Sequence, residues 1–176
     1  SKGFYKDDFI SIYTGRITMD KGPLILAKAI NHLQERGLKQ FKGLIIGDGE
    51  FDIVEELKCL KGINLYPFKQ WFELRDYYCI SDVGVWPKEE STSRYDAAAC
   101  DLPIIMSNNA NDIISKLQFS FKYKEDDYIS LANTLIEVNK ILKQKPFSNN
   151  SSDFIRNNCS WDQIAKGRIK DYKKII

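Results

Sequence analysis

The sequence has little of what metal centres, redox motifs and membrane anchors require. It contains one histidine and four scattered cysteines, none of them in a C-x-x-C pair, which argues against structural zinc. Separate thiols are typical of a cytosolic protein with reduced cysteines. No apolar run reaches the ~18 residues that a membrane-spanning helix needs. The net charge of only +2 provides no general polyanion-binding surface, so we expect no nucleic-acid partner.

What the chain does have is the size and composition of one soluble domain. Its 176 residues are 43% hydrophobic and 28% charged, which is typical of a globular protein with its own core. The chain starts at Ser1 without a methionine. We therefore expect residues 1–176 to be a single domain cut from a longer protein.

Short apolar runs alternate with helical patterns along the chain. The expected strands cover residues 9–13, 41–46, 63–66, 83–86, 102–106 and 119–123. The expected helices cover residues 23–36, 51–60, 71–80, 93–100, 112–116, 126–143, 153–158 and 161–176. Helices between successive strands indicate a parallel sheet with right-handed crossovers. The sequence thus predicts an α/β fold, a single Rossmann-like doubly wound domain with six parallel strands in the order 3-2-1-4-5-6.

A basic loop follows the first expected strand. Gly15 and Arg16 end this strand, and Lys21 lies just before the helix that begins at Pro23. An arginine and a lysine five residues apart can both reach one diphosphate from such a loop. The helix N-terminus adds favourable partial charge for an anion. A solvated basic loop with a glycine turn is the alternative.

Two further strand ends carry weaker signals. Gly47-Asp48-Gly49 resembles the start of a dinucleotide-binding fingerprint, but the third glycine is absent and the motif follows the second strand. The NAD interpretation is therefore weak, and a tight turn is the alternative, beside a ligand or not. After the third strand, Phe68 and Lys69 could hold a nucleobase. Here the alternative is a surface turn that covers the core.

The polar loop and helix start after strand 83–86 are the most informative stretch. Ligands of parallel sheets lie beyond the carboxyl ends of the strands, and this loop holds Glu89 and Glu90 followed by three hydroxyl side chains, Ser91, Thr92 and Ser93. Carboxylates accept paired hydrogen bonds from vicinal sugar hydroxyls. Hydroxyl and free N–H groups at a helix start suit a phosphate. We interpret the stretch as the donor end of a sugar-nucleotide site.

A capping box is the alternative for part of this stretch. Ser93 and Asp96 have the spacing of an N-cap serine and an acidic residue that returns to it. That interpretation explains both residues without a ligand, but it leaves Glu89 and Glu90 unexplained. An acid and base pair of a hydrolase has no geometric support from adjacent carboxylates.

Five motifs, in sequence order, resemble the carboxy-terminal half of a GT-B glycosyltransferase of family four, the glycosyl transferases group 1. They are Tyr13-Thr14-Gly15-Arg16 with Lys21-Gly22, Ile45-Ile46-Gly47-Asp48-Gly49, Ser81-Asp82-Val83-Gly84-Val85-Trp86-Pro87, Asp96-Ala97-Ala98-Ala99-Cys100-Asp101-Leu102-Pro103, and Ser160-Trp161-Asp162-Gln163-Ile164-Ala165. Each motif alone is loose, and the order of all five makes the resemblance specific.

The resemblance implies a role for each matched residue. Arg16 and Lys21 would neutralise the donor diphosphate, which is the leaving group, and Glu90 would face the donor sugar. The remaining residues would bind the donor: Gly15 and Gly47 by close backbone approach, Glu89 as the alternative to Glu90, Ser91, Thr92 and Ser93 at phosphate, Asp96 at ribose, and Phe68 and Lys69 beside the base. The implied reaction is transfer from a UDP-sugar or GDP-sugar with retention, without metal or cofactor, through stabilisation of the leaving diphosphate.

Several departures from the family pattern matter. Five residues separate Glu90 from Asp96, whereas seven are usual, and Asp101 stands where the family usually has glycine. The amino-terminal domain, which would hold the acceptor, is missing. We therefore expect this chain to bind the donor weakly and to transfer nothing unaided.

The resemblance also implies partners and a location for the full-length enzyme. The acceptor would be a glycan or lipid-linked molecule in bacterial surface polysaccharide synthesis. The enzyme would be a cytoplasmic hexosyltransferase. The resemblance leaves open whether it also associates peripherally with the inner face of the membrane. The main alternative is a non-catalytic nucleotide- or sugar-binding module of the same fold. A receiver domain would need an acidic cluster after the first strand, where Arg16 stands, and an epimerase would need GxxGxxG and YxxxK.

Overall fold

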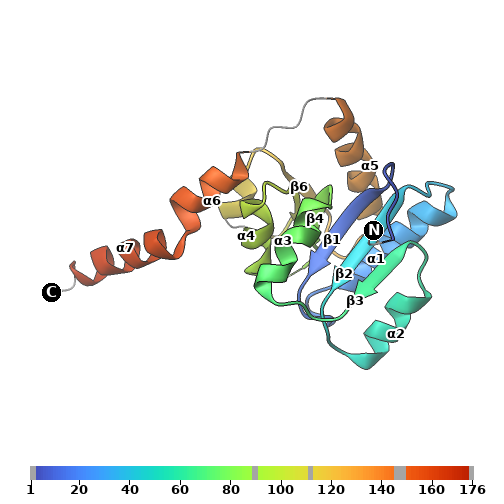
Figure 1. Ribbon diagram of the computed structural model, residues 1–176, viewed down its shortest axis with the longest axis horizontal. Coiled ribbons are helices and arrows are strands. Elements are labelled where there is room, and N and C mark those ends of the chain that lie inside the picture. Colours follow the sequence, from blue (N-terminus) through green and yellow to red (C-terminus); the bar gives the residue numbers. More distant parts are fainter. Residues whose placement is uncertain (1–2, 89–90, 111–112, 145–149, 175–176) are drawn as a thin grey trace.

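A parallel sheet of six strands forms the centre of the molecule (Figure 1). The computed structural model describes residues 3–88, 91–110, 113–144 and 150–174. The strands are β1 (Phe9–Thr14), β2 (Phe41–Ile46), β3 (Ile63–Tyr66), β4 (Val83–Trp86), β5 (Ile104–Ser107) and β6 (Ser120–Tyr123). Their order is β3-β2-β1-β4-β5-β6, and each neighbouring pair is parallel. The predicted fold class and strand order are confirmed.

Helices connect the strands and cover both faces of the sheet. They are α1 (Pro23–Glu35), α2 (Phe51–Cys59), α3 (Trp71–Cys79), α4 (Ser93–Ala99), the short 3-10 helix η1 (Ile113–Lys116), α5 (Tyr128–Gln144), α6 (Ser151–Cys159) and α7 (Trp161–Tyr172). Helix α1 packs against α2 and α5, whereas α4 packs against α3 and α6. All residues of β1, β4 and β5 are buried, as expected for a parallel sheet that is covered on both sides.

The predicted element boundaries differ from the observed ones by a few residues, for identifiable reasons. Strand β5 begins at Ile104, two residues later than predicted, because Pro103 lacks an N–H group and contributes only its carbonyl, which accepts from Gly84 N at 2.8 Å. The predicted helix over residues 112–116 is a 3-10 turn at Ile113–Lys116. Helix α7 has no buried residue and projects from the body of the domain (Figure 1). None of the described helices is long and apolar enough to cross a membrane.

Asp101 anchors the start of α6 to the turn between α4 and β5. Its backbone is in the left-handed conformation, with φ 57°, which residues other than glycine adopt at a cost in free energy. Its carboxylate accepts two hydrogen bonds from Ser152, one from the backbone N at 2.8 Å and one from Oγ at 3.0 Å. Helix α6 consequently begins at Ser151, two residues before its predicted start. The departure from glycine noted at this position thus has a structural use.

Replacing Asp101 separates the two effects of this residue on stability. Asp101→Ala loses the bonds to Ser152 and keeps the left-handed backbone, so we expect the free energy of unfolding to fall by about 1.5–3 kcal/mol. Asp101→Gly loses the same bonds but relieves a backbone cost of about 1 kcal/mol, so its loss should be smaller. Denaturant unfolding measures the free energy of unfolding of both variants.

The control is the exposed Asp153, which is paired with Arg156 on α6. Its replacement by alanine should change the free energy of unfolding little. Equal stability of Asp101→Ala and wild type would contradict the anchor.

Candidate functional site

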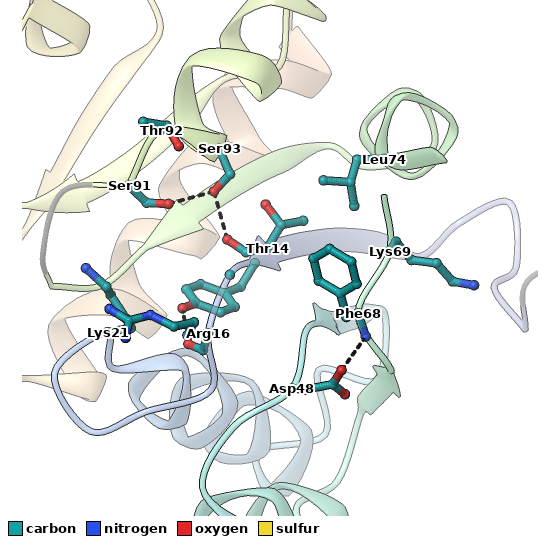
Figure 2. Close-up of a pocket in the computed structure, with 12 residues that line it drawn as sticks. Thr14, Arg16, Lys21, Asp48, Phe68, Lys69, Leu74, Ser91, Thr92 and Ser93 are labelled. Carbon is teal, nitrogen blue, oxygen red and sulfur yellow. Dashed lines mark hydrogen bonds between the residues drawn. The ribbon is translucent and has the colours of Figure 1, made fainter. Parts of the chain in front are cut away.

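A cavity of about 460 Å³ opens beyond the carboxyl ends of β1 and β4 (Figure 2). Its walls come from four segments that are distant in sequence. The lining residues are Tyr13, Thr14, Gly15, Arg16, Lys21, Asp48, Phe68, Lys69, Leu74, Ser91, Thr92 and Ser93. The basic loop after β1 and the hydroxyl-bearing segment after β4 therefore share one crevice, which is the arrangement that the sequence predicted. The cavity also contains the predicted base-side residues Phe68 and Lys69.

The backbone at the end of β1 is held in place beside the cavity. The Tyr13 hydroxyl donates to the Arg16 carbonyl at 2.7 Å, and burial, with a contribution from Asp20, raises the pKa of Tyr13. This hydroxyl therefore keeps its proton at neutral pH. A Cβ atom at Gly15 would lie 3.0 Å from the Tyr13 hydroxyl oxygen, so the tyrosine ring can approach only because this residue is glycine. Arg16 thus extends from a fixed turn.

The two glycines of the Gly47-Asp48-Gly49 motif allow close packing of two loops. A Cβ atom at Gly47 would lie 1.9 Å from the Gly15 carbonyl oxygen, and one at Gly49 would lie 2.0 Å from the Ile17 carbonyl oxygen. Ile17 and Gly49 form a parallel bridge. Gly47 lines a neighbouring cavity with Gly49 and Phe51, not the one in Figure 2. The tight turn accounts for these glycines, and it places Asp48 at the edge of the site.

Asp48 is a cavity residue that the sequence interpretation did not select. Its Oδ2 accepts from the Phe68 N at 3.3 Å, and this contact joins the turns after β2 and β3 (Figure 2). The Phe68 side chain is exposed, and the Lys69 ammonium lies 3.7 Å from Glu73 on α3. The sequence carried no separate signal for Asp48, because aspartate and glycine are both common turn residues.

The alternative interpretation of Ser93 and Asp96, a capping box, is wrong. The N-cap residue of α4 is Thr92, and no side chain caps this helix. The Ser93 Oγ instead donates to the Thr14 carbonyl at 2.8 Å (Figure 2). This bond joins the end of β1 to the beginning of α4 across the cavity floor. A pattern of spacing could not reveal it, because the partner is 79 residues away.

Like Gly47, the predicted site residue Asp96 does not line this cavity. Asp96 lines an adjacent cavity of about 540 Å³ between α4, α6 and α7, together with Tyr95, Ile155 and Trp161. Loss of water contact raises the pKa of the Asp96 carboxyl. The two cavities share Thr92. Glu89 and Glu90 lie outside the described residues. Within the described part of the chain, no cluster of three or more His, Cys, Asp or Glu side chains is arranged to hold a metal ion.

Residues 8–140 match the sequence model of the family described as glycosyl transferases group 1. The chain belongs to this family. No curated protein matches the sequence. In this glycosyl transferase domain the cavity is lined by eight of the predicted site residues, namely Gly15, Arg16, Lys21, Phe68, Lys69, Ser91, Thr92 and Ser93.

Solved structures share the fold of this glycosyl transferase domain. A glycosyltransferase from Rickettsia africae superposes with a TM-score of 0.74 at 18% identity, over 97% of this chain and 48% of that chain. HepE from Anabaena in complex with UDP gives 0.76 at 16%, over 96% and 49%. Sucrose-phosphate synthase from Thermosynechococcus elongatus gives 0.76 at 19%, over 96% and 46%. The chain thus has the Rossmann-like fold of a GT-B carboxy-terminal domain and spans about half the length of these proteins.

Proposed function

We propose that the cavity binds the nucleotide-sugar donor of a retaining glycosyltransferase, and that residues 1–176 are its donor-binding half. The observation that carries this proposal is the joint position of Arg16 and Lys21 on one side of a single cavity and Ser91 to Ser93 on another. A diphosphate is negatively charged and accepts hydrogen bonds, and this cavity is lined by two positively charged side chains and by hydroxyl groups that can donate them. HepE, which shares the fold, has been solved with UDP and with UDP-glucose, and this supports UDP as the first candidate.

The chemistry follows from where negative charge develops during the reaction. When the bond from the anomeric carbon to the diphosphate breaks, charge accumulates on the departing phosphate oxygens. Arg16 and Lys21 would stabilise this charge more strongly in the transition state than in the bound donor. Glu90, or Glu89 in its place, would face the sugar. Asp96 lines the adjacent cavity and would bind a ribose that extends past Thr92, the residue that the two cavities share. No metal is required in this scheme, because the two side chains supply the positive charge.

The activity of the full-length protein forms the second part of the proposal. An amino-terminal domain would bind a glycan or lipid-linked acceptor, and the enzyme would act as a cytoplasmic hexosyltransferase in bacterial surface polysaccharide synthesis. It would associate with the inner face of the membrane if the acceptor is lipid-linked. The isolated chain would bind donor and transfer nothing.

Calorimetry of this chain tests the donor site directly. UDP, GDP, UDP-glucose and uridine are titrated separately, each with and without EDTA. We expect one of the diphosphates to bind, uridine to bind much more weakly because it lacks the phosphates, and EDTA to have no effect. Absence of binding for all four ligands would contradict the proposal. A full-length protein that binds the donor and transfers no sugar would favour the non-catalytic module.

A further inference from the structure

Trp86 directs its indole N–H toward the end of β1 and the start of α4, two segments that line the cavity. The side chain is 1% exposed and folds back over Gly84, where a Cβ atom would lie 2.5 Å from the ring carbon Cζ3. In this position the indole N–H donates to two oxygens, the Thr14 carbonyl at 3.2 Å and the Ser93 Oγ at 3.0 Å. Gly84 is therefore required for the orientation of the ring.

Counting protons shows that the hydroxyls of Ser93 and Ser91 are committed to this arrangement. A serine hydroxyl has one proton and two lone pairs. Ser93 donates its proton to the Thr14 carbonyl and accepts from the Trp86 indole. The hydrogen bond between the Ser91 and Ser93 hydroxyls, 2.8 Å long, must then have Ser91 as the donor. Ser93 has its full set of partners, and the proton of Ser91 points toward Ser93.

The side chain of Thr14 completes the link to α3. Thr14 Oγ1 lies 2.8 Å from the Tyr78 hydroxyl oxygen, and Tyr78 is buried. Burial raises the pKa of Tyr78, so its hydroxyl stays protonated and can serve this bond at any physiological pH. Thr14 is followed directly by Gly15 and Arg16, and the network therefore sets the position of the basic loop relative to the start of α4.

We propose that Trp86 and Ser93 are positioning residues that hold the end of β1 against the start of α4. In this proposal the hydroxyl groups of Ser91 and Ser93 do not donate hydrogen bonds to the ligand. This inference rests on the proposed function. The donor phosphates would then be bound by Arg16, Lys21 and Thr92, an exposed residue of the cavity lining, while Ser93 holds these groups at the correct separation. The sequence interpretation, in which Ser91 and Ser93 offer hydroxyl groups to phosphate, gives a different result in the experiment below.

A double-mutant cycle on UDP binding separates the two roles. Trp86→Phe and Ser93→Ala each remove more than one hydrogen bond of the network, and each should weaken binding roughly fivefold or more. The double variant should be no weaker than the more affected single variant, because both changes break one network. Ser93→Thr should restore most of the binding.

Ser81→Ala is the matched control for this cycle, because the Ser81 hydroxyl also donates to a backbone carbonyl, that of Tyr77 at 2.7 Å, away from the cavity. If Ser93 donated directly to phosphate, Ser93→Ala would weaken binding and Trp86→Phe would not, which would overturn the proposal.

The hydrogen-bond network can also be tested without ligand. The chain has three tryptophans, and Trp71 and Trp161 are 78% and 86% exposed, so only the Trp86 indole proton should exchange slowly with deuterium in NMR spectra. Ser93→Ala should accelerate this exchange at least severalfold, whereas Ser81→Ala should not.

The outcomes of the two experiments are distinguishable. If Trp86→Phe fails to fold, the variants Ser93→Ala and Ser93→Thr still test the proposal. An indole exchange rate that Ser93→Ala leaves unchanged would overturn the positioning role. A wild-type chain that binds no nucleotide would contradict the proposed function and the positioning role with it, while the exchange result still decides the network.

Discussion

Replacing Arg16 with alanine is expected to weaken binding of the donor diphosphate by about 10- to 100-fold. Hydrogen bonds from a charged group to an anion contribute about 1.5–3 kcal/mol, and 1.4 kcal/mol corresponds to a factor of ten in affinity. The turn that carries Arg16 is fixed by Tyr13, so little backbone entropy is lost when the guanidinium engages the ligand. Lys21→Ala should weaken binding in the same direction. Titration calorimetry with UDP and GDP measures both changes.

Controls for this result must separate a local contact from a change in net charge. Lys166 is exposed on α7 and paired with Asp162, outside the cavity lining, so Lys166→Ala removes the same charge and should leave affinity unchanged. Arg16→Lys retains the charge but loses bidentate geometry, so its affinity should be intermediate. Uridine, which has no phosphate, should bind all variants alike. Unchanged diphosphate binding by the Arg16→Ala and Lys21→Ala double variant would show that the diphosphate lies elsewhere.

Replacing Gly47 with alanine is expected to lower both the stability of the fold and the affinity for the donor. The new Cβ would lie 1.9 Å from the Gly15 carbonyl oxygen, far inside van der Waals contact. Neither atom can move away without a shift of the backbone, because one is a backbone atom and the other is bonded directly to Cα. The loops after β1 and β2 would have to separate, which costs about 1–3 kcal/mol as in an overpacked core. For a chain of this size that corresponds to a lower melting temperature by about 2–12 °C. Thermal and denaturant unfolding measure the change.

The same substitution links the fold to the site. Separating the two loops moves Gly15 and Arg16, so donor affinity should fall in Gly47→Ala even under conditions where the variant is fully folded. A Cβ atom added at Gly167, on the exposed helix α7, would meet no atom within 4 Å. Gly167→Ala should therefore leave binding unchanged and raise stability slightly through helix propensity. A Gly47→Ala variant as stable as wild type would mean that the loops can separate without cost.

Much of the architecture could be predicted from local patterns alone. The alternation of apolar runs and helical faces determined the α/β class, and strands such as Phe41–Ile46, Ile63–Tyr66 and Val83–Trp86 were predicted to the residue. These signals are local because the period of apolar residues and the turn chemistry act over a few neighbours. The strand order followed from the handedness of parallel crossovers. Boundaries were less accurate where a distant side chain decides them, as with Asp101 at the start of α6.

The candidate site was predictable to a smaller extent. Gly15, Arg16, Lys21 and the hydroxyl-bearing segment were selected correctly as neighbours of one cavity, because residues at the carboxyl ends of adjacent parallel strands must meet at one edge of the sheet. The sequence also determined which residue types and charges stand at that edge. The partner of each side chain was decided only by tertiary structure. Ser93 bonds to Thr14 and Trp86 and caps no helix, Asp96 faces a second cavity, and Gly47 makes room for another loop. Hydrogen bonds and steric contacts act over about 3 Å between residues that can be dozens of positions apart, so these pairings exist only once the sheet has brought the strand ends together.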